Sequence, residues 1–120
     1  MPSVYNRIAA AYAICDQLIT AVDILPTRIP NHIRFRLTLT DDSHLHISEE
    51  WRRGTLGAYS YYWLDAHDAL IQGWDNAPHY PRLSHHPLHT HIGSQSNRQP
   101  SASNNLAYVL AIIRSQFDTV

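Results

Sequence analysis

The residues best suited to chemistry in this chain are histidines gathered in its C-terminal half. Five of the nine histidines lie within thirteen residues, and the ones that we single out are His79, His89 and His91. Imidazole accepts or donates protons near neutral pH, because its ordinary pKa of about 6.5 lies there. Asp75 comes four residues before the first of them and could orient an imidazole. The segment therefore suggests either acid–base catalysis or metal binding.

One interpretation is metal-independent cleavage of RNA. This reaction needs a base for the 2′-OH proton, an acid for the departing 5′ oxygen and cations around the phosphorus, and each proton transfer contributes about 10²–10⁴-fold. The histidines could serve as acid and base, while arginine binds phosphate through paired N–H donors. The candidates for phosphate contact are Arg52, Arg53 and Arg82, and those for stacking on an unpaired base are Tyr62 and Tyr80.

Two other interpretations stay open at this point. Three or four imidazoles together with Asp75 could bind zinc or iron, although their spacing matches no known metal motif. The histidines could also be ordinary polar residues of a surface loop. On this reading His44 and His46, on the polar side of a predicted strand, are solvated, and His32 and His67 are structural. Cys15 lies on an apolar helix face and is predicted to pack in the core.

Charge and cysteine content narrow the classes of protein. The chain has no lysine, nine arginines and a formal net charge of −1, so it lacks a general basic field for nucleic acid. Residues 76–117 nevertheless carry three arginines and no acidic residue, which suggests an anionic partner. The single cysteine excludes an intrachain disulfide and a cysteine-based zinc site. The longest apolar run has eight residues, too short to cross a bilayer, so we expect a cytoplasmic protein without membrane contact.

The elements that must position these residues follow from the hydrophobic pattern. The length of the chain, 120 residues, predicts one domain, residues 1–120. Apolar residues recur at helical spacing over residues 8–22 and 106–117, and alternate as in strands between them. The predicted strands cover residues 33–39, 45–48, 58–65 and 69–75, and residues 76–100 have no clear period.

This order predicts an α+β fold. Short connections between the strands indicate a four-stranded antiparallel sheet, on which an N-terminal and a C-terminal helix must bury their apolar faces. The long histidine-rich loop comes just before the last helix, and irregular segments of that length are usually functional. The active residues are therefore expected at the end of the last strand, where this loop begins.

Several motifs together resemble the TumE-type toxins of bacterial and archaeal toxin–antitoxin pairs. They are residues 53–57 (Arg-Gly-Thr-Leu-Gly), the tyrosine-rich strand ending in Trp63, residues 74–79 (Trp-Asp-Asn-Ala-Pro-His) and residues 87–93 (Pro-Leu-His-Thr-His-Ile-Gly). The resemblance covers roughly the C-terminal two-thirds, and the Asp-Asn-Ala-Pro-His string is its most specific part. The positions that match the family are Asp75, Asn76, Pro78, His79, His89 and His91.

The resemblance implies a small ribonuclease toxin that arrests growth by cutting RNA without a cofactor. It also implies an antitoxin partner that typically carries a helix-turn-helix, and a homo-oligomer is compatible with the sequence. On this basis His79 and one of His89 or His91 are acid and base, and Asp75 orients an imidazole. Contacts to the substrate are assigned to Arg53, Arg82, Asn76 and Tyr62. The chain departs from the family pattern at Gly73, Tyr80 and Thr90, where a phosphate-binding or second histidine side chain is usual. The alternative function is a non-catalytic or metal-binding interaction module that uses the histidine-rich loop.

Overall fold

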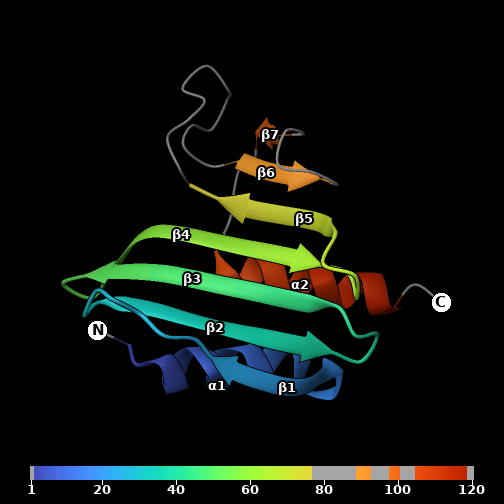
Figure 1. The fold of residues 1–120 in the computed structure, drawn as a ribbon, viewed down its shortest axis with the longest axis horizontal. Helices are drawn as coiled ribbons and strands as arrows, with labels where there is room; N and C mark the ends of the chain where they lie inside the picture. Colours follow the sequence, from blue (N-terminus) through green and yellow to red (C-terminus); the bar gives the residue numbers. More distant parts are fainter. Residues whose placement is uncertain (1, 77–88, 93–97, 101–104, 119–120) are drawn as a thin grey trace.

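The protein is an antiparallel sheet with two helices on one face, as seen in the computed structural model (Figure 1). The structure describes residues 2–76, 89–92, 98–100 and 105–118, with 89–92 and 98–100 described by their backbone. The helices are α1 (Val4–Cys15) and α2 (Leu106–Asp118), and a short 3-10 turn, η1 (Asp16–Leu18), follows α1. The strands are β1 (Ile19–Ile24), β2 (His32–Leu39), β3 (His44–Arg52), β4 (Thr55–Leu64), β5 (Leu70–Asp75), β6 (His89–Ile92) and β7 (Arg98–Pro100). The α+β class and the two helices on an antiparallel sheet are confirmed.

The number of strands differs from the prediction, because the described residues form seven strands in chain order. The first difference is β1, which the helical spacing over residues 8–22 had assigned to the first helix. Helix α1 ends at Cys15, and β1 instead pairs with β2 along residues 19–24. This segment is rich in β-branched residues, which fit a pleated surface, and hydrogen bonds to a neighbouring strand outweigh its helical spacing.

The second difference lies in residues 76–100, which were predicted to be irregular. Part of this stretch forms β6 and β7, which extend the sheet beyond β5. The alternating sequence of β6 can pair with β5, whose edge would otherwise present unpaired backbone groups. The histidine-rich segment is therefore tied to the sheet through its last two histidines.

Alternation along the central strands separates a core face from a face without helices. Along β2 and β3, residues 33–39 and 45–49 alternate between buried and half-buried positions, as the sequence predicts. The buried positions face α1 and α2, and Cys15 lies among them as expected. Among the described residues no helix covers the opposite face, and none is long and apolar enough to span a membrane (Figure 1).

One charged network lies on the core face between α1 and the sheet. Glu49 is completely buried, and both of its carboxylate oxygens accept 2.8 Å hydrogen bonds from the guanidinium of Arg7. The hydroxyl of Tyr61 donates to the same carboxylate at 2.6 Å, and Trp51 donates at 3.3 Å. Burial strongly raises the pKa of Tyr61, so its hydroxyl keeps the proton that it donates. The network therefore compensates a buried carboxylate and fixes α1 to β3.

Both helices begin at a residue whose side chain caps the first turn. Ser3 caps α1, where its hydroxyl accepts from the Asn6 amide and the Asn6 side chain accepts from the Ser3 amide in return. Asn105 caps α2, and its side chain accepts from the amide of Tyr108 at 2.8 Å. Each cap stands directly before the first helical residue and satisfies an amide of the first turn.

Candidate active site

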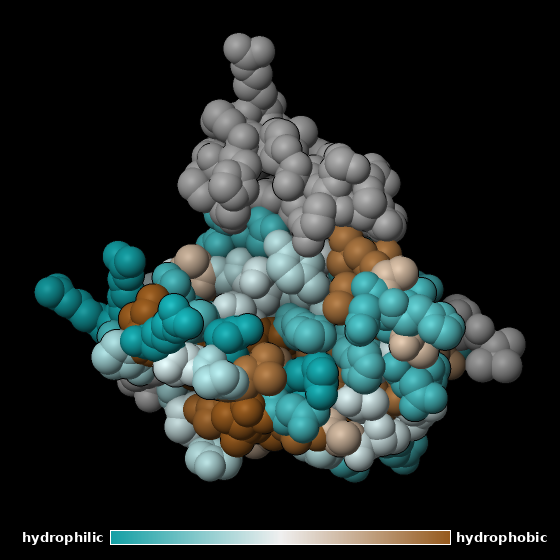
Figure 2. Space-filling model, viewed as in Figure 1, coloured by the Kyte–Doolittle hydropathy of each residue, from teal (hydrophilic) through white to brown (hydrophobic). Residues whose placement is uncertain are grey.

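A pocket of about 440 Å³ opens on the helix-free face of the sheet, where β3, β4 and β5 run side by side. Figure 2 shows this face, on which hydrophilic residues gather across the middle. Three of the predicted site residues line the pocket, namely Tyr62, Asp75 and Asn76, and His32 and Ser60 line it with them. The pocket therefore lies at the end of β5, where the sequence places the start of the functional segment.

Asp75 contributes a buried carboxylate to this pocket, whose lining also includes Glu50. It is the last residue of β5 and is only 5% exposed. The hydroxyl of Tyr62, on the neighbouring strand β4, donates a 2.8 Å hydrogen bond to Asp75 Oδ2. A buried carboxylate held by a hydrogen bond has a fixed orientation, which is what an acceptor for an imidazole N–H requires. The arrangement can therefore orient a histidine.

Asn76 ties the end of β5 to β4. Its Nδ2 donates to the carbonyl of Gly57 at 2.9 Å, and its Oδ1 accepts from the amide of Tyr59 at 2.9 Å. Both ends of the amide group are therefore engaged by backbone next to the pocket. This contact holds the chain at the point where it leaves the sheet and enters residues 77–88.

The two histidines of β6 come next to β5 in the sheet. His89 pairs in register with Asp75, and His91 pairs with Gly73. Neighbouring strands are about 4.8 Å apart, so these backbone positions adjoin the pocket. His79 and Arg82, together with the remaining loop histidines, lie outside the described residues.

Arg53 lies away from the pocket in the described structure. It occupies the two-residue turn between β3 and β4 with Gly54, and both residues have positive φ. Asp75 pairs with Ser60, five residues along β4 from the turn, which corresponds to about 17 Å of extended strand. The pocket lining does not include Arg53.

Sequence reasoning missed a group of residues on β2 and β3. Arg36 pairs with His46, and His46 pairs with Tyr62, so these three side chains share one row on the helix-free face. His46 was predicted to be solvated, yet it is half-buried and lines a second hollow of about 270 Å³ with Arg34 and Tyr62. The alternation of histidine and arginine on the two strands was the available signal. The register between β2, β3 and β4 is what aligns Arg36 and His46 with Tyr62.

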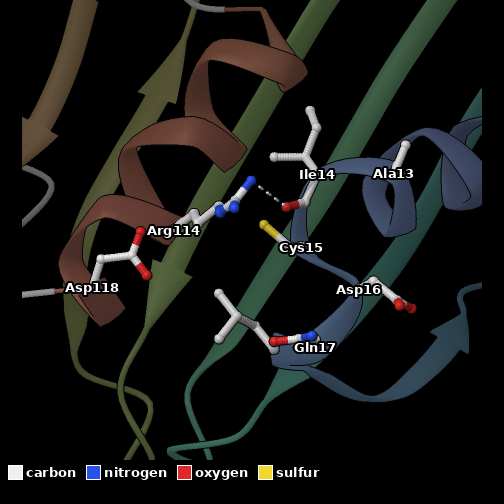
Figure 3. Close-up of a pocket in the computed structure, with 8 residues that line it drawn as sticks. Ala13, Ile14, Cys15, Asp16, Gln17, Arg114 and Asp118 are labelled. Atoms are coloured by element: carbon white, nitrogen blue, oxygen red, sulfur yellow. Dashed lines mark hydrogen bonds between the residues drawn. The ribbon is translucent and has the colours of Figure 1, made fainter.

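A further hollow, of about 280 Å³, lies between the C-terminal ends of α1 and α2 (Figure 3). Arg114 points across it and donates to the carbonyl of Ile14 at 3.4 Å. Burial raises the pKa of the Cys15 thiol, which disfavours the reactive thiolate. This hollow lacks a histidine among its lining residues and is poorly suited to acid–base chemistry. Within the described part of the chain, no three His, Cys, Asp or Glu side chains cluster as metal ligands would.

Comparisons with known proteins agree with the resemblance carried by the motifs. A family model described as "Toxin TumE" matches residues 8–117, which is most of the chain. No curated protein and no solved structure matches the chain.

Proposed function

As the chain belongs to the TumE toxin family and is thus a toxin component of a toxin–antitoxin system, we propose that it arrests growth as a metal-independent ribonuclease. The substrate is cellular RNA, and the reaction takes place in the cytoplasm. A cognate antitoxin protein with a helix-turn-helix neutralises it. Self-association into a homo-oligomer is compatible with this role.

The observation that supports this proposal best is the Tyr62–Asp75 hydrogen bond beside the backbone positions of His89 and His91. A fixed carboxylate next to imidazoles is the arrangement that sets an imidazole's tautomer for proton transfer. The loop histidine His79 follows Asp75 by four residues. In the proposed reaction His79 and one of the β6 histidines exchange the protons, and Asp75 orients an imidazole.

The remaining predicted residues contact the substrate. Arginine holds phosphate through two parallel N–H donors, and we assign this role to Arg82, because Arg53 lies away from the pocket. Tyr62 lines the pocket and offers a ring on which an unstacked base can lie. Asn76 lies at the same edge of the pocket and keeps the strand end in place for substrate contact.

The experiment is cleavage of a defined RNA by purified toxin, together with growth arrest on expression without antitoxin. We expect products that end in a 2′,3′-cyclic phosphate, and full activity after treatment with a chelator. His79→Ala, His89→Ala and His91→Ala should each abolish both readouts. The matched control is His44→Ala, because His44 lies on the same sheet but outside the pocket lining.

Two outcomes would contradict the proposal. Stoichiometric zinc, with a melting temperature that collapses on chelation, would favour a metal site. Equal RNA decay with wild type and all variants, or no decay with any of them, would favour a non-catalytic interaction module. Binding of the antitoxin by each variant shows that it has folded.

A further inference from the structure

His46 lies at the centre of the helix-free face, one strand away from the Tyr62–Asp75 pair. It pairs in register with Tyr62 on β4 and with Arg36 on β2. Side chains at directly opposed positions of antiparallel strands have Cβ atoms about 4.5–5.5 Å apart. His46 therefore stands next to the ring whose hydroxyl holds Asp75.

The two hollows on this face adjoin each other. The hollow lined by His46 and the pocket lined by Asp75 share Ser48, Ser60 and Tyr62. His46 lines only the first of them, and Asp75 lines only the second. A dinucleotide step lying across both hollows would contact both residues, with its base over Tyr62.

The surroundings of His46 favour its neutral form. Burial lowers the pKa of His46, and the cation of Arg36 lowers it further. His44 on its own strand and Arg34 on β2 also lower this pKa, and Asp68 in the β4–β5 turn raises it. Tyr62 on β4 is the further titratable group opposite His46. A neutral imidazole has a free lone pair at neutral pH, which is the form required of a proton acceptor.

Two arginines, Arg34 and Arg36, also lie on this face. Arg36 Nη2 donates to Asp23 at 2.8 Å in an exposed pair, and its Nε is buried without a hydrogen-bond partner among the described residues. Arg34 Nη1 donates to the carbonyl of Pro26 at 3.1 Å. Each guanidinium carries five donors, so both can still donate a hydrogen bond to a phosphate oxygen. Exposed ion pairs are weak, and Arg36 can exchange Asp23 for a phosphate at little cost.

We propose that His46 is the general base of RNA cleavage, an assignment that rests on the proposed ribonuclease function. His46 takes the proton from the 2′-OH as the 2′ oxygen attacks phosphorus. The bond between phosphorus and the 5′ oxygen breaks, and a 2′,3′-cyclic phosphate forms. His46 thereby replaces one member of the histidine pair proposed above as the base, and the departing 5′ oxygen takes a proton from the other member, which remains the acid. Arg34, which lines the same hollow as His46, stabilises the charge on the phosphorane oxygens.

His44 provides a matched control two residues away. It lies on the same strand and the same face, and its Nδ1 is 3.2 Å from the hydroxyl of Thr38. It pairs with Leu64 rather than with Tyr62, and neither hollow includes it in its lining. His44 and His46 therefore differ in position relative to the site but not in chemistry.

The test uses the full chain and a short fluorogenic RNA containing one cleavable step. His46→Ala should lower kcat by about 10²–10⁴-fold, the usual contribution of a positioned base, with KM changed little. In the wild type the acidic limb of the kcat/KM profile reports the base in the free enzyme, and its midpoint should lie below about 6.5. That limb should disappear in His46→Ala, and added imidazole should restore part of the rate. His44→Ala should keep wild-type kcat and KM and retain the acidic limb, with its midpoint raised slightly because His44 helps to lower the pKa of His46.

The outcomes separate this inference from the proposed function. RNA cleavage by the wild type, with His46→Ala as active as His44→Ala, overturns the role of His46 and leaves the ribonuclease in place. A loss in His46→Ala that appears only in KM, without imidazole rescue, overturns it as well and indicates RNA binding. No cleavage by the wild type refutes the ribonuclease itself. Antitoxin binding and the melting temperature of each variant identify a folding defect. If His46→Ala does not fold, imidazole rescue of the folded His46→Gly variant decides whether His46 is the base.

Discussion

The buried charge network allows a quantitative test of how α1 is held on the sheet. The perturbation is Arg7→Met, which removes the guanidinium and keeps a long apolar stem with a similar helix propensity. In the wild type this guanidinium makes two 2.8 Å hydrogen bonds to Glu49 and stacks 5.4 Å from the ring centre of Trp51. The substitution leaves a fully buried carboxylate with neutral donors alone.

The expected cost follows from burial. Removing one partner of a buried ion pair typically costs about 3–5 kcal/mol, because the remaining charge stays desolvated. Arg7 is 21% exposed, and Glu49 retains donors from Tyr61 and Trp51, so we expect a loss near the lower end, about 3 kcal/mol. For a domain of this size that corresponds to a melting temperature lower by roughly 10–15 °C.

The assay is urea denaturation followed by tryptophan fluorescence, for Arg7→Met, Glu49→Gln and the double variant. The neutral amide removes the buried charge and can still accept from Tyr61, so the double variant should be more stable than Arg7→Met alone. The matched control is Arg36→Met, which breaks a pair with the same 2.8 Å distance but with side chains 38% and 50% exposed. This control should cost less than about 1 kcal/mol. A loss for Arg7→Met as small as that of the control, or strictly additive losses in the double variant, would refute the reasoning.

Three further predictions concern stability around the site and the last helix. Asn76→Ala removes two hydrogen bonds between β5 and β4 and should lower the free energy of unfolding by about 1–3 kcal/mol in urea denaturation; an unchanged midpoint would show that water replaces them. Because the pKa of His46 is lowered in the folded state, the unfolded chain binds more protons just below its ordinary pKa of about 6.5, and stability must fall as the pH falls through that value. Melting curves between pH 7 and 5 should show a shallower decline for His46→Gln, and equal slopes would contradict the shift. Asn105→Ala removes the cap of α2 and should cost about 1 kcal/mol, measured by thermal unfolding against a surface alanine substitution elsewhere in the helix.

The hydrophobic pattern was sufficient to predict the class of fold and most of its elements. Period-2 alternation over residues 33–39 and 45–48 identifies two adjacent strands because only one side of each is buried. It does not identify β1, since residues 19–22 continue a helical spacing and become a strand only by pairing with β2. Strands β6 and β7 were missed for a related reason. They are short and polar, and a neighbouring strand supplies the hydrogen bonds that define them.

For the candidate site, the sequence likewise identified several residues, whereas the contacts between them depend on the tertiary structure. Residue types and the resemblance to the toxin family pointed to Asp75, Asn76 and Tyr62, and the structure places all three around one pocket, because residues at the end of β5 and on β4 are close along a short hairpin. The hydrogen bond from Tyr62 to Asp75 and the row that joins His46 to Tyr62 depend on strand register. A shift of one residue would turn every side chain of β3 to the other face, so register is decided by the packing of the whole sheet. The sequence by itself thus determined most of the residues that could do chemistry, although it did not single out His46. Only the tertiary structure decided which of them meet, because contacts between strands depend on an alignment that no single strand encodes.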